Sequence, residues 1–154
     1  MPRETASSER EFLKECRCVA VSACLLGENC KYSGGNNLNK ELAALLEGKT
    51  VVAVCPEILG GLSVPRKPCE IKNGRVIDTD RLDVTKFFRK GALSALKTIT
   101  DCGAEMVILQ PRSPSCGSKQ IYDGTFSKKL AAGQGVFAKL LAEHGIKIID
   151  ADEL

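Results

Sequence analysis

Four short apolar runs alternate along the chain with segments whose apolar residues recur at helical spacing. The runs span residues 18–22, 51–55, 106–109 and 146–149, and β-branched side chains are frequent in them. Nearly continuous apolar character, rather than strict alternation with polar residues, is typical of strands that are covered on both faces of a parallel sheet. The pattern therefore predicts four parallel strands.

Helical patterns lie between these runs. Ser8 and Glu11 form a capping box that predicts a helix before the first strand. Asn39 is the expected N-cap of a short helix that Gly48 ends. Helical spacing also predicts a long helix over residues 84–101 and a last helix around residues 136–144, and Asn73-Gly74 predicts a hairpin turn.

The alternation of strands and helices predicts an α/β fold, a single-domain, Rossmann-like three-layer sandwich around a mostly parallel sheet. A length of 154 residues is typical of one domain, and we treat residues 1–17 as an N-terminal helical extension of it. Hydrophobic residues make up 44% and charged residues 27% of the chain, which is an ordinary globular balance.

Membrane insertion and secretion are not expected. No apolar stretch approaches the roughly 20 residues of a membrane-spanning helix, and the opening residues lack the apolar core of a signal peptide. We therefore expect a cytoplasmic protein. The net charge of +3 comes from basic residues scattered among acidic ones, so no stable nucleic-acid complex is expected.

Eight cysteines, no tryptophan and a single histidine are the unusual features of the composition. In a cytosolic chain with a core of its own, so many thiols indicate metal or redox chemistry rather than a disulfide framework. His144 falls in the last turn of the last predicted helix, where a cation complements the helix dipole. Catalysis would then depend on Cys, Ser, Asp, Glu or Tyr.

Three cysteines occupy equivalent positions. Cys24, Cys55 and Cys116 each follow or end one of the first three apolar runs. Because ligands of open parallel sheets bind outside the carboxyl ends of the strands, these thiols are expected to converge. Soft sulfur ligands select zinc, copper(I) or an iron–sulfur cluster. The alternative is that the three cysteines are small buried hydrophobes.

Other candidates lie close to these three in the sequence. Glu57 could transfer protons or be a solvated loop carboxylate, and Ser113 could donate a hydrogen bond to a ligand or form a turn. Cys30 and Cys69 fall in loops and could be resolving thiols or substitute ligands. Cys16 and Cys102 are expected on the apolar faces of helices, and the backbone amides of residues 133–135 could bind an anion at a helix N-terminus.

Seven motifs in one order resemble the DUF523 family, whose members include the thiouracil desulfidases (TudS-like proteins). The resemblance extends over residues 19–148, and the motifs are residues 21–27, 30–35, 55–57, 60–66, 83–85, 113–117 and 121–126.

The resemblance implies a [4Fe-4S] cluster held by Cys24, Cys55 and Cys116, with one iron not ligated by protein. It implies that this open iron binds the sulfur of a thiolated nucleobase and then the released hydrosulfide. Glu57 would be the proton-transferring carboxylate and Ser113 a second catalytic hydroxyl. The implied activity is a non-redox desulfidase that converts thiouracil to the oxo form, acting as a monomer or weak homodimer.

Two other classes of function fit the same residues. The protein could be a zinc- or thiol-based structural or redox-sensing protein, or a cluster-bearing sulfur carrier without desulfidase activity. Metal and sulfide analysis separates the zinc or thiol protein from the other two, and a product assay separates the carrier from the enzyme.

Overall fold

Four parallel strands form the central sheet of the computed structural model, which describes the backbone of residues 2–154 and the side chains from residue 8 onward. The sheet has the order β2-β1-β5-β8, and all of its neighbouring strands are parallel. The strands are β1 (Cys18–Ser22), β2 (Thr50–Val54), β5 (Met106–Leu109) and β8 (Ile148–Asp150). The α/β class and the parallel sheet are confirmed.

Helices cover both faces of this sheet. Val19 and Val21 point into one hydrophobic cluster, whereas Ala20 between them points into the other, and all three are fully buried. The first cluster lies under α1 (Pro2–Glu15) and α2 (Lys40–Leu45), and the second under α4 (Thr85–Asp101) and α5 (Val136–Glu143). Burial on both faces explains why the strands read as continuous apolar runs.

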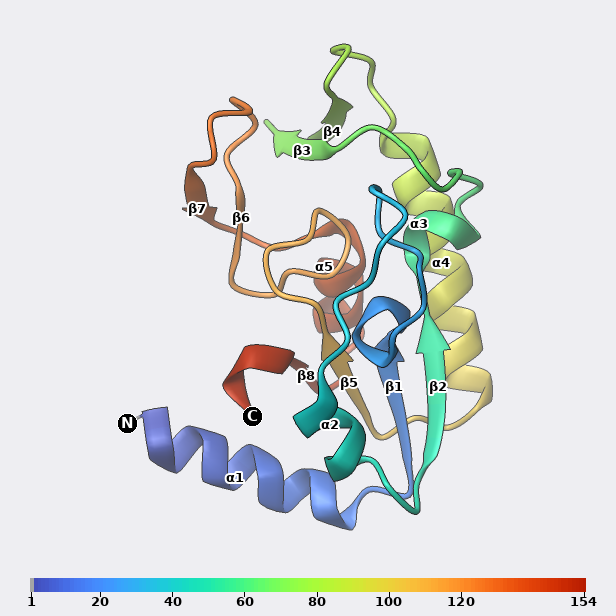
Figure 1. Ribbon diagram of the computed structural model, residues 1–154, viewed down its shortest axis with the longest axis vertical. Helices are drawn as coiled ribbons and strands as arrows, with labels where there is room; N and C mark the ends of the chain where they lie inside the picture. Colours follow the sequence, from blue (N-terminus) through green and yellow to red (C-terminus); the bar gives the residue numbers. More distant parts are fainter. Residues whose placement is uncertain (1) are drawn as a thin grey trace.

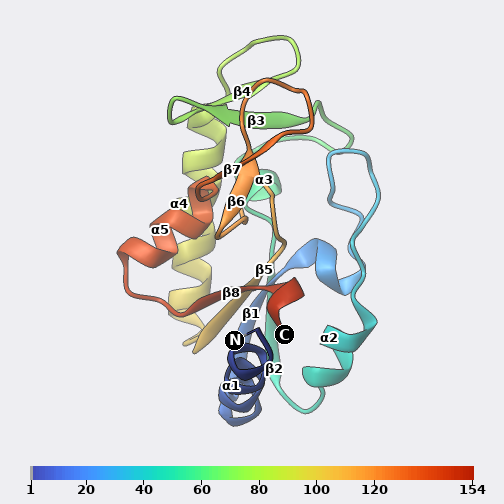
Figure 2. The same cartoon turned by 90° about the vertical axis from the view of Figure 1, so that its left-hand side faces the viewer.

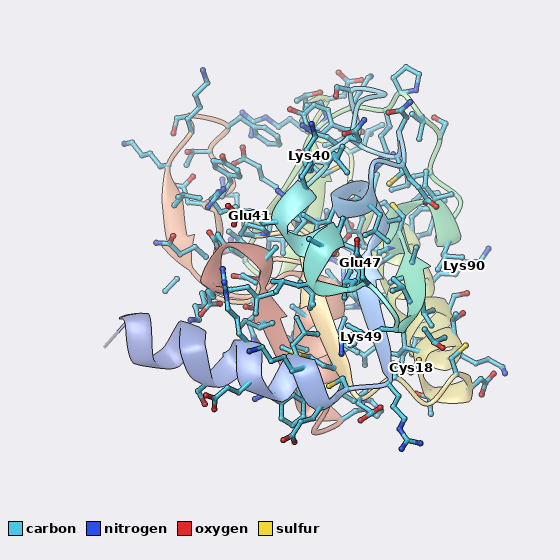
Figure 3. The ribbon with its side chains drawn as sticks, turned by 60° about the horizontal axis from the view of Figure 1, so that its bottom comes forward. Cys18, Lys40, Glu41, Glu47, Lys49 and Lys90 are labelled. Carbon is cyan, nitrogen blue, oxygen red and sulfur yellow. The ribbon has the colours of Figure 1, made fainter. Side chains whose placement is uncertain are left out.

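The short helix α2 begins as predicted. The Oδ1 atom of Asn39 accepts a hydrogen bond from the backbone amide of Leu42 at 3.0 Å, which satisfies one of the free amides of the first turn. Figure 3 labels Lys40 and Glu41 on the exposed side of this helix. After the helix, the Nζ atom of Lys49 donates to the carbonyl oxygen of Cys16 at 2.7 Å, at the C-terminal end of α1.

Two predictions about helix residues were wrong. The helix α1 begins at Pro2, so Ser8 lies inside it and does not cap it. Proline suits the first position of a helix, and Arg3, Glu4 and Ala6 have high helix propensity, which is consistent with the earlier start. Cys16 is buried as expected, but Cys102 is exposed because it follows the last turn of α4 at the surface. In the chain from residue 2 to 154, no helix has the length and apolar character needed to cross a membrane.

Two small antiparallel hairpins lie beyond the carboxyl ends of the sheet strands (Figures 1 and 2). The first pairs β3 (Cys69–Lys72) with β4 (Arg75–Asp78) through the predicted Asn73-Gly74 turn, where both residues have positive φ. The second, β6 (Gln120–Tyr122) with β7 (Leu130–Ala132), was not predicted. The Oε1 atom of Glu70 joins them, because it accepts from the amides of Gly124 and Phe126 at 3.0 Å each.

The one-turn helix α3 (Pro56–Leu59) packs directly against the backbone of α4. Two glycines make this approach possible: a Cβ on Gly91 would overlap the carbonyl oxygen of Pro56, and a Cβ on Gly60 would overlap that of Phe87. Because α3 starts immediately after β2, the contact with α4 fixes the segment that contains Cys55 and Glu57.

Candidate functional site

The three cysteines singled out in the sequence leave the same end of three adjacent strands. Cys24 lies in the short 3-10 helix η1 (Ala23–Leu26) directly after β1, Cys55 is the N-cap of α3 directly after β2, and Cys116 lies in the loop after β5. The chain passes from β1 to β2 on one side and then returns to β5 on the other. Such a reversal between neighbouring strands is where open α/β sheets bind ligands.

The three thiols are close enough to influence one another electrostatically. Burial raises the pKa of Cys116 most, a hydrogen bond with Ser22 lowers it, and the charges of Glu57, Cys24 and Cys55 raise it further. Burial also raises the pKa of Cys24, which a hydrogen bond from Asn37 Nδ2 to its Sγ at 3.3 Å partly offsets. Thiolates in this position need a positive charge beside them, which bound metal ions supply. The donor set therefore fits a thiophilic metal centre, and an iron–sulfur cluster is one of the centres that such ligands select.

The loop that contains Cys116 is ordered by its own serines. The Oγ atom of Ser113 accepts from the backbone amides of Ser115 and Cys116, at 3.1 Å each. The amide of Gly117 donates to the carbonyl oxygen of Ser113 at 2.9 Å and closes the turn. In this geometry Ser113 fixes the backbone of Cys116. The two hydrogen bonds use its oxygen as an acceptor, so its O–H remains available as a donor.

The same loop covers the N-terminus of α5. The carbonyl oxygens of Pro114 and Ser115 accept from the amides of Val136 and Phe137, both at 2.9 Å. A Cβ on Gly135 would lie 2.5 Å from the Ser115 carbonyl oxygen, so the two backbones are in direct contact. The amides of Gly133 and Gly135 also donate to carbonyl oxygens, those of Lys119 at 3.0 Å and Gly117 at 2.8 Å, so the anion site expected from these glycine amides is wrong.

Glu57 is held at both of its carboxylate oxygens. Arg66 donates from Nε to Oε1 at 3.0 Å, and Ser115 donates from Oγ to Oε2 at 3.1 Å. The side chains of Arg66 and Glu57 are only 7% and 15% exposed. From the sequence, Arg66 is only a basic residue that could add positive charge near the site, and Ser115 is only part of a Ser-Pro-Ser turn. The contact of each with Glu57 leaves no local pattern in the sequence.

Cys30 lies beside Cys55. Burial, followed by the charge of Cys55, raises the pKa of the Cys30 thiol to about 12. The Cys55 thiol points at the carbonyl oxygen of Cys30, 4.0 Å away, and Arg66 Nη2 donates to the same oxygen at 2.8 Å. The loop after η1 is thereby tied to both Cys55 and Arg66.

Cys69 lies at the start of β3, where it lines a cavity of about 490 Å³ together with Arg66, Asp78 and Leu62. This volume falls in the usual range for small-molecule sites. Burial raises the pKa of Cys69 to about 12, and the charges of Glu57 and Asp78 add to the effect. One wall of the cavity is therefore formed by Arg66, the residue that binds Glu57.

We expect Cys69 to resist alkylation at neutral pH although it lines a cavity. The thiolate is the reactive form, so a raised pKa should make Cys69 react with iodoacetamide about 100-fold more slowly than exposed Cys102 at pH 8. Its rate should rise tenfold per pH unit up to pH 11. Peptide mass mapping of timed reactions measures both rates, and equal rates at pH 8 would contradict the expectation.

The fold and the site together define an α/β protein with a thiol-lined centre at the carboxyl end of a parallel sheet. Within this class, the family model described as 2-thiouracil desulfurase matches residues 19–153. The chain belongs to the 2-thiouracil desulfurase (DUF523) family, as its motifs indicated.

Two relatives share 39% sequence identity with the chain. One is the uncharacterized protein YbbK of Bacillus subtilis (strain 168), aligned over 146 residues that cover 88% of this chain and 97% of YbbK. The other is a solved structure of the [4Fe-4S]-dependent thiouracil desulfidase TudS (DUF523Vcz), with a TM-score of 0.84 over 90% of this chain and 93% of TudS.

Proposed function

We propose that the protein is a [4Fe-4S]-dependent, non-redox desulfidase that converts thiolated pyrimidines such as thiouracil to the oxo form and releases sulfide. The observation that carries the proposal is the grouping of three strand-end thiols beside a carboxylate that has partners at both oxygens. Membership of the desulfurase family and the likeness to TudS support it.

In this proposal Cys24, Cys55 and Cys116 hold the cluster at the carboxyl ends of the strands of a Rossmann-like sandwich, and one iron has no protein ligand. When bound, the cluster supplies a sulfur-seeking Lewis acid that polarises the carbon–sulfur bond. The fit rests on the chemistry of the donor set, because three thiolates are the ligands that iron–sulfur clusters prefer.

The protein's own residues then move protons. Glu57 accepts one proton from the water whose oxygen adds to the ring carbon. The second proton of that water passes to the sulfur, the oxygen becomes the carbonyl oxygen of the product, and the sulfur leaves the carbon as hydrosulfide. Both electrons of the broken bond leave with the sulfur, so no oxidant or reductant is needed. The oxygen of Ser113 already accepts hydrogen bonds from two backbone amides, so its O–H is available to donate a hydrogen bond to the substrate. The Arg66 guanidinium, which contacts Oε1 of Glu57 at 3.0 Å, holds the carboxylate in place.

Metal analysis and a product assay test the proposal. Protein purified without oxygen should contain about four irons and four acid-labile sulfides per chain, the composition of a [4Fe-4S] cluster, and should convert thiouracil to uracil. Cys116→Ser should lose the cluster, whereas Cys102→Ser, at an exposed thiol, should keep it. Zinc without sulfide would instead identify a zinc or thiol protein. A cluster without uracil formation would identify a sulfur carrier.

A further inference from the structure

The Glu57 carboxylate cannot rotate without losing a partner. Its two oxygens are bound by different elements, Oε1 by Arg66 from the loop after α3 and Oε2 by Ser115 from the loop after β5. Each partner donates to a different oxygen, so the two hydrogen bonds together fix the orientation of the carboxylate plane. A proton acceptor that must meet a water at one position gains from this fixed orientation.

Arg66 is itself fixed by three further contacts. Its Nη1 donates to the carbonyl oxygen of Ser63 at 3.1 Å, its Nη2 donates to that of Cys30 at 2.8 Å, and its backbone amide donates to that of Tyr32 at 2.8 Å. The planar guanidinium thus spans two loops and the carboxylate at once. Lysine has a single ammonium group and cannot reproduce this geometry.

Ser115 is fixed on the other side. Its side chain is buried at 1% exposure, its amide donates to Ser113 Oγ, and its carbonyl oxygen caps α5. The hydroxyl can therefore reach Glu57 only along one direction. The position of the Oε2 atom of Glu57 therefore depends on the loop that also contains Cys116.

We propose that Arg66 is the positioning residue for Glu57 in the desulfidase reaction, and that Ser115 fixes the second carboxylate oxygen. The inference rests on the proposed function. It assigns Arg66 to the carboxylate and not to the substrate, because three of the five N–H donors of its guanidinium are held by protein oxygens, one of them on Glu57.

Steady-state kinetics of three variants test the assignment. Arg66→Gln should lower kcat about 100-fold with KM changed less than about twofold, since orientation and not binding is lost. Arg66→Lys should recover part of the loss, and Ser115→Ala should lower kcat about tenfold. The matched control is Arg75→Gln, which breaks the exposed ion pair with Asp83 and should leave kcat unchanged.

A double-mutant cycle separates positioning from a general structural role. In a Glu57→Gln background, Arg66→Gln should cause no further loss of kcat, because the group it orients is already gone. Iron content should equal that of the parent in every variant. The proposal would be overturned if the fold-losses in kcat of the two single variants multiplied in the double variant. It would also be overturned if the loss of kcat followed a loss of iron.

Thermal unfolding of the cluster-free chain supplies a second readout that does not depend on activity. Arg66→Gln should lower the midpoint by about 8 °C in the parent and by less than half of that in the Glu57→Gln background, because a mostly buried ion pair is broken only in the parent. Equal shifts would show that Arg66 does not act through Glu57. If the parent does not convert thiouracil, the proposed function fails while this coupling can still be measured.

Discussion

Glu57→Gln is expected to lower kcat for thiouracil by about 10² to 10⁴-fold, the range lost when a positioned general base is removed. Glutamine has nearly the same shape and can still accept a hydrogen bond from Ser115, so the loop after β5 should keep its place. It cannot accept a proton from water at neutral pH. The loss should therefore appear in the chemical step and not in the amount of folded protein.

Uracil formation under single-turnover conditions is the measurement, with iron and sulfide content determined on the same samples. Glu41→Gln, on the exposed side of α2, is the matched control and should behave as the parent does. Full turnover by Glu57→Gln with an intact cluster would remove Glu57 from the mechanism. The attacking water would then need another proton acceptor.

Gly91→Ala is expected to destabilise the protein by about 3 kcal/mol, the upper end of the usual range for substitutions that overpack a buried contact. The direction of this change in stability is informative, because alanine in the middle of a helix normally stabilises the folded state by about 1 kcal/mol relative to glycine. Here the added methyl group would overlap the carbonyl oxygen of Pro56, which belongs to α3 and has no room to move.

Urea denaturation measures this change, and Lys90→Ala is its control. Lys90 precedes Gly91 in α4, is exposed and is labelled in Figure 3, so its replacement adds no overlap. Because displacement of α3 also moves Cys55 and Glu57, the glycine variant should lose iron binding even where it stays folded. A Gly91→Ala protein as stable as the parent would show that α3 can move away without cost.

The hydrophobic pattern predicted most of the fold because the sheet strands are buried on both faces. Continuous β-branched runs located β1, β2 and β5 to within a residue, and Asn39 and Asn73-Gly74 located a cap and a turn. The hairpin of β6 and β7 has no such pattern in the sequence, because β7 is short and its residues Leu130, Ala131 and Ala132 are exposed. Tertiary contacts stabilise this hairpin, including the two hydrogen bonds that Glu70 accepts from its loop.

The candidate site was predictable only as far as topology determines it. Parallel strands bring their carboxyl ends together, so the meeting of Cys24, Cys55 and Cys116 follows from their positions after strands. The partners of Glu57 do not follow from position, because Ser115 is 58 residues away and its approach depends on the conformation of a loop. The roles of these residues in catalysis stay predictions.

The pairing of β1 with β5 has a consequence for how the chain acquires its site. Val19 pairs with Met106, so the centre of the sheet joins segments that lie far apart in sequence, and contacts of that kind form slowly. During synthesis Cys24 and Cys55 leave the ribosome well before Cys116, and the α5 amides that bind the carbonyl oxygens of the Cys116 loop follow later still. All three thiols and these contacts are therefore present together only when nearly the whole protein has been made.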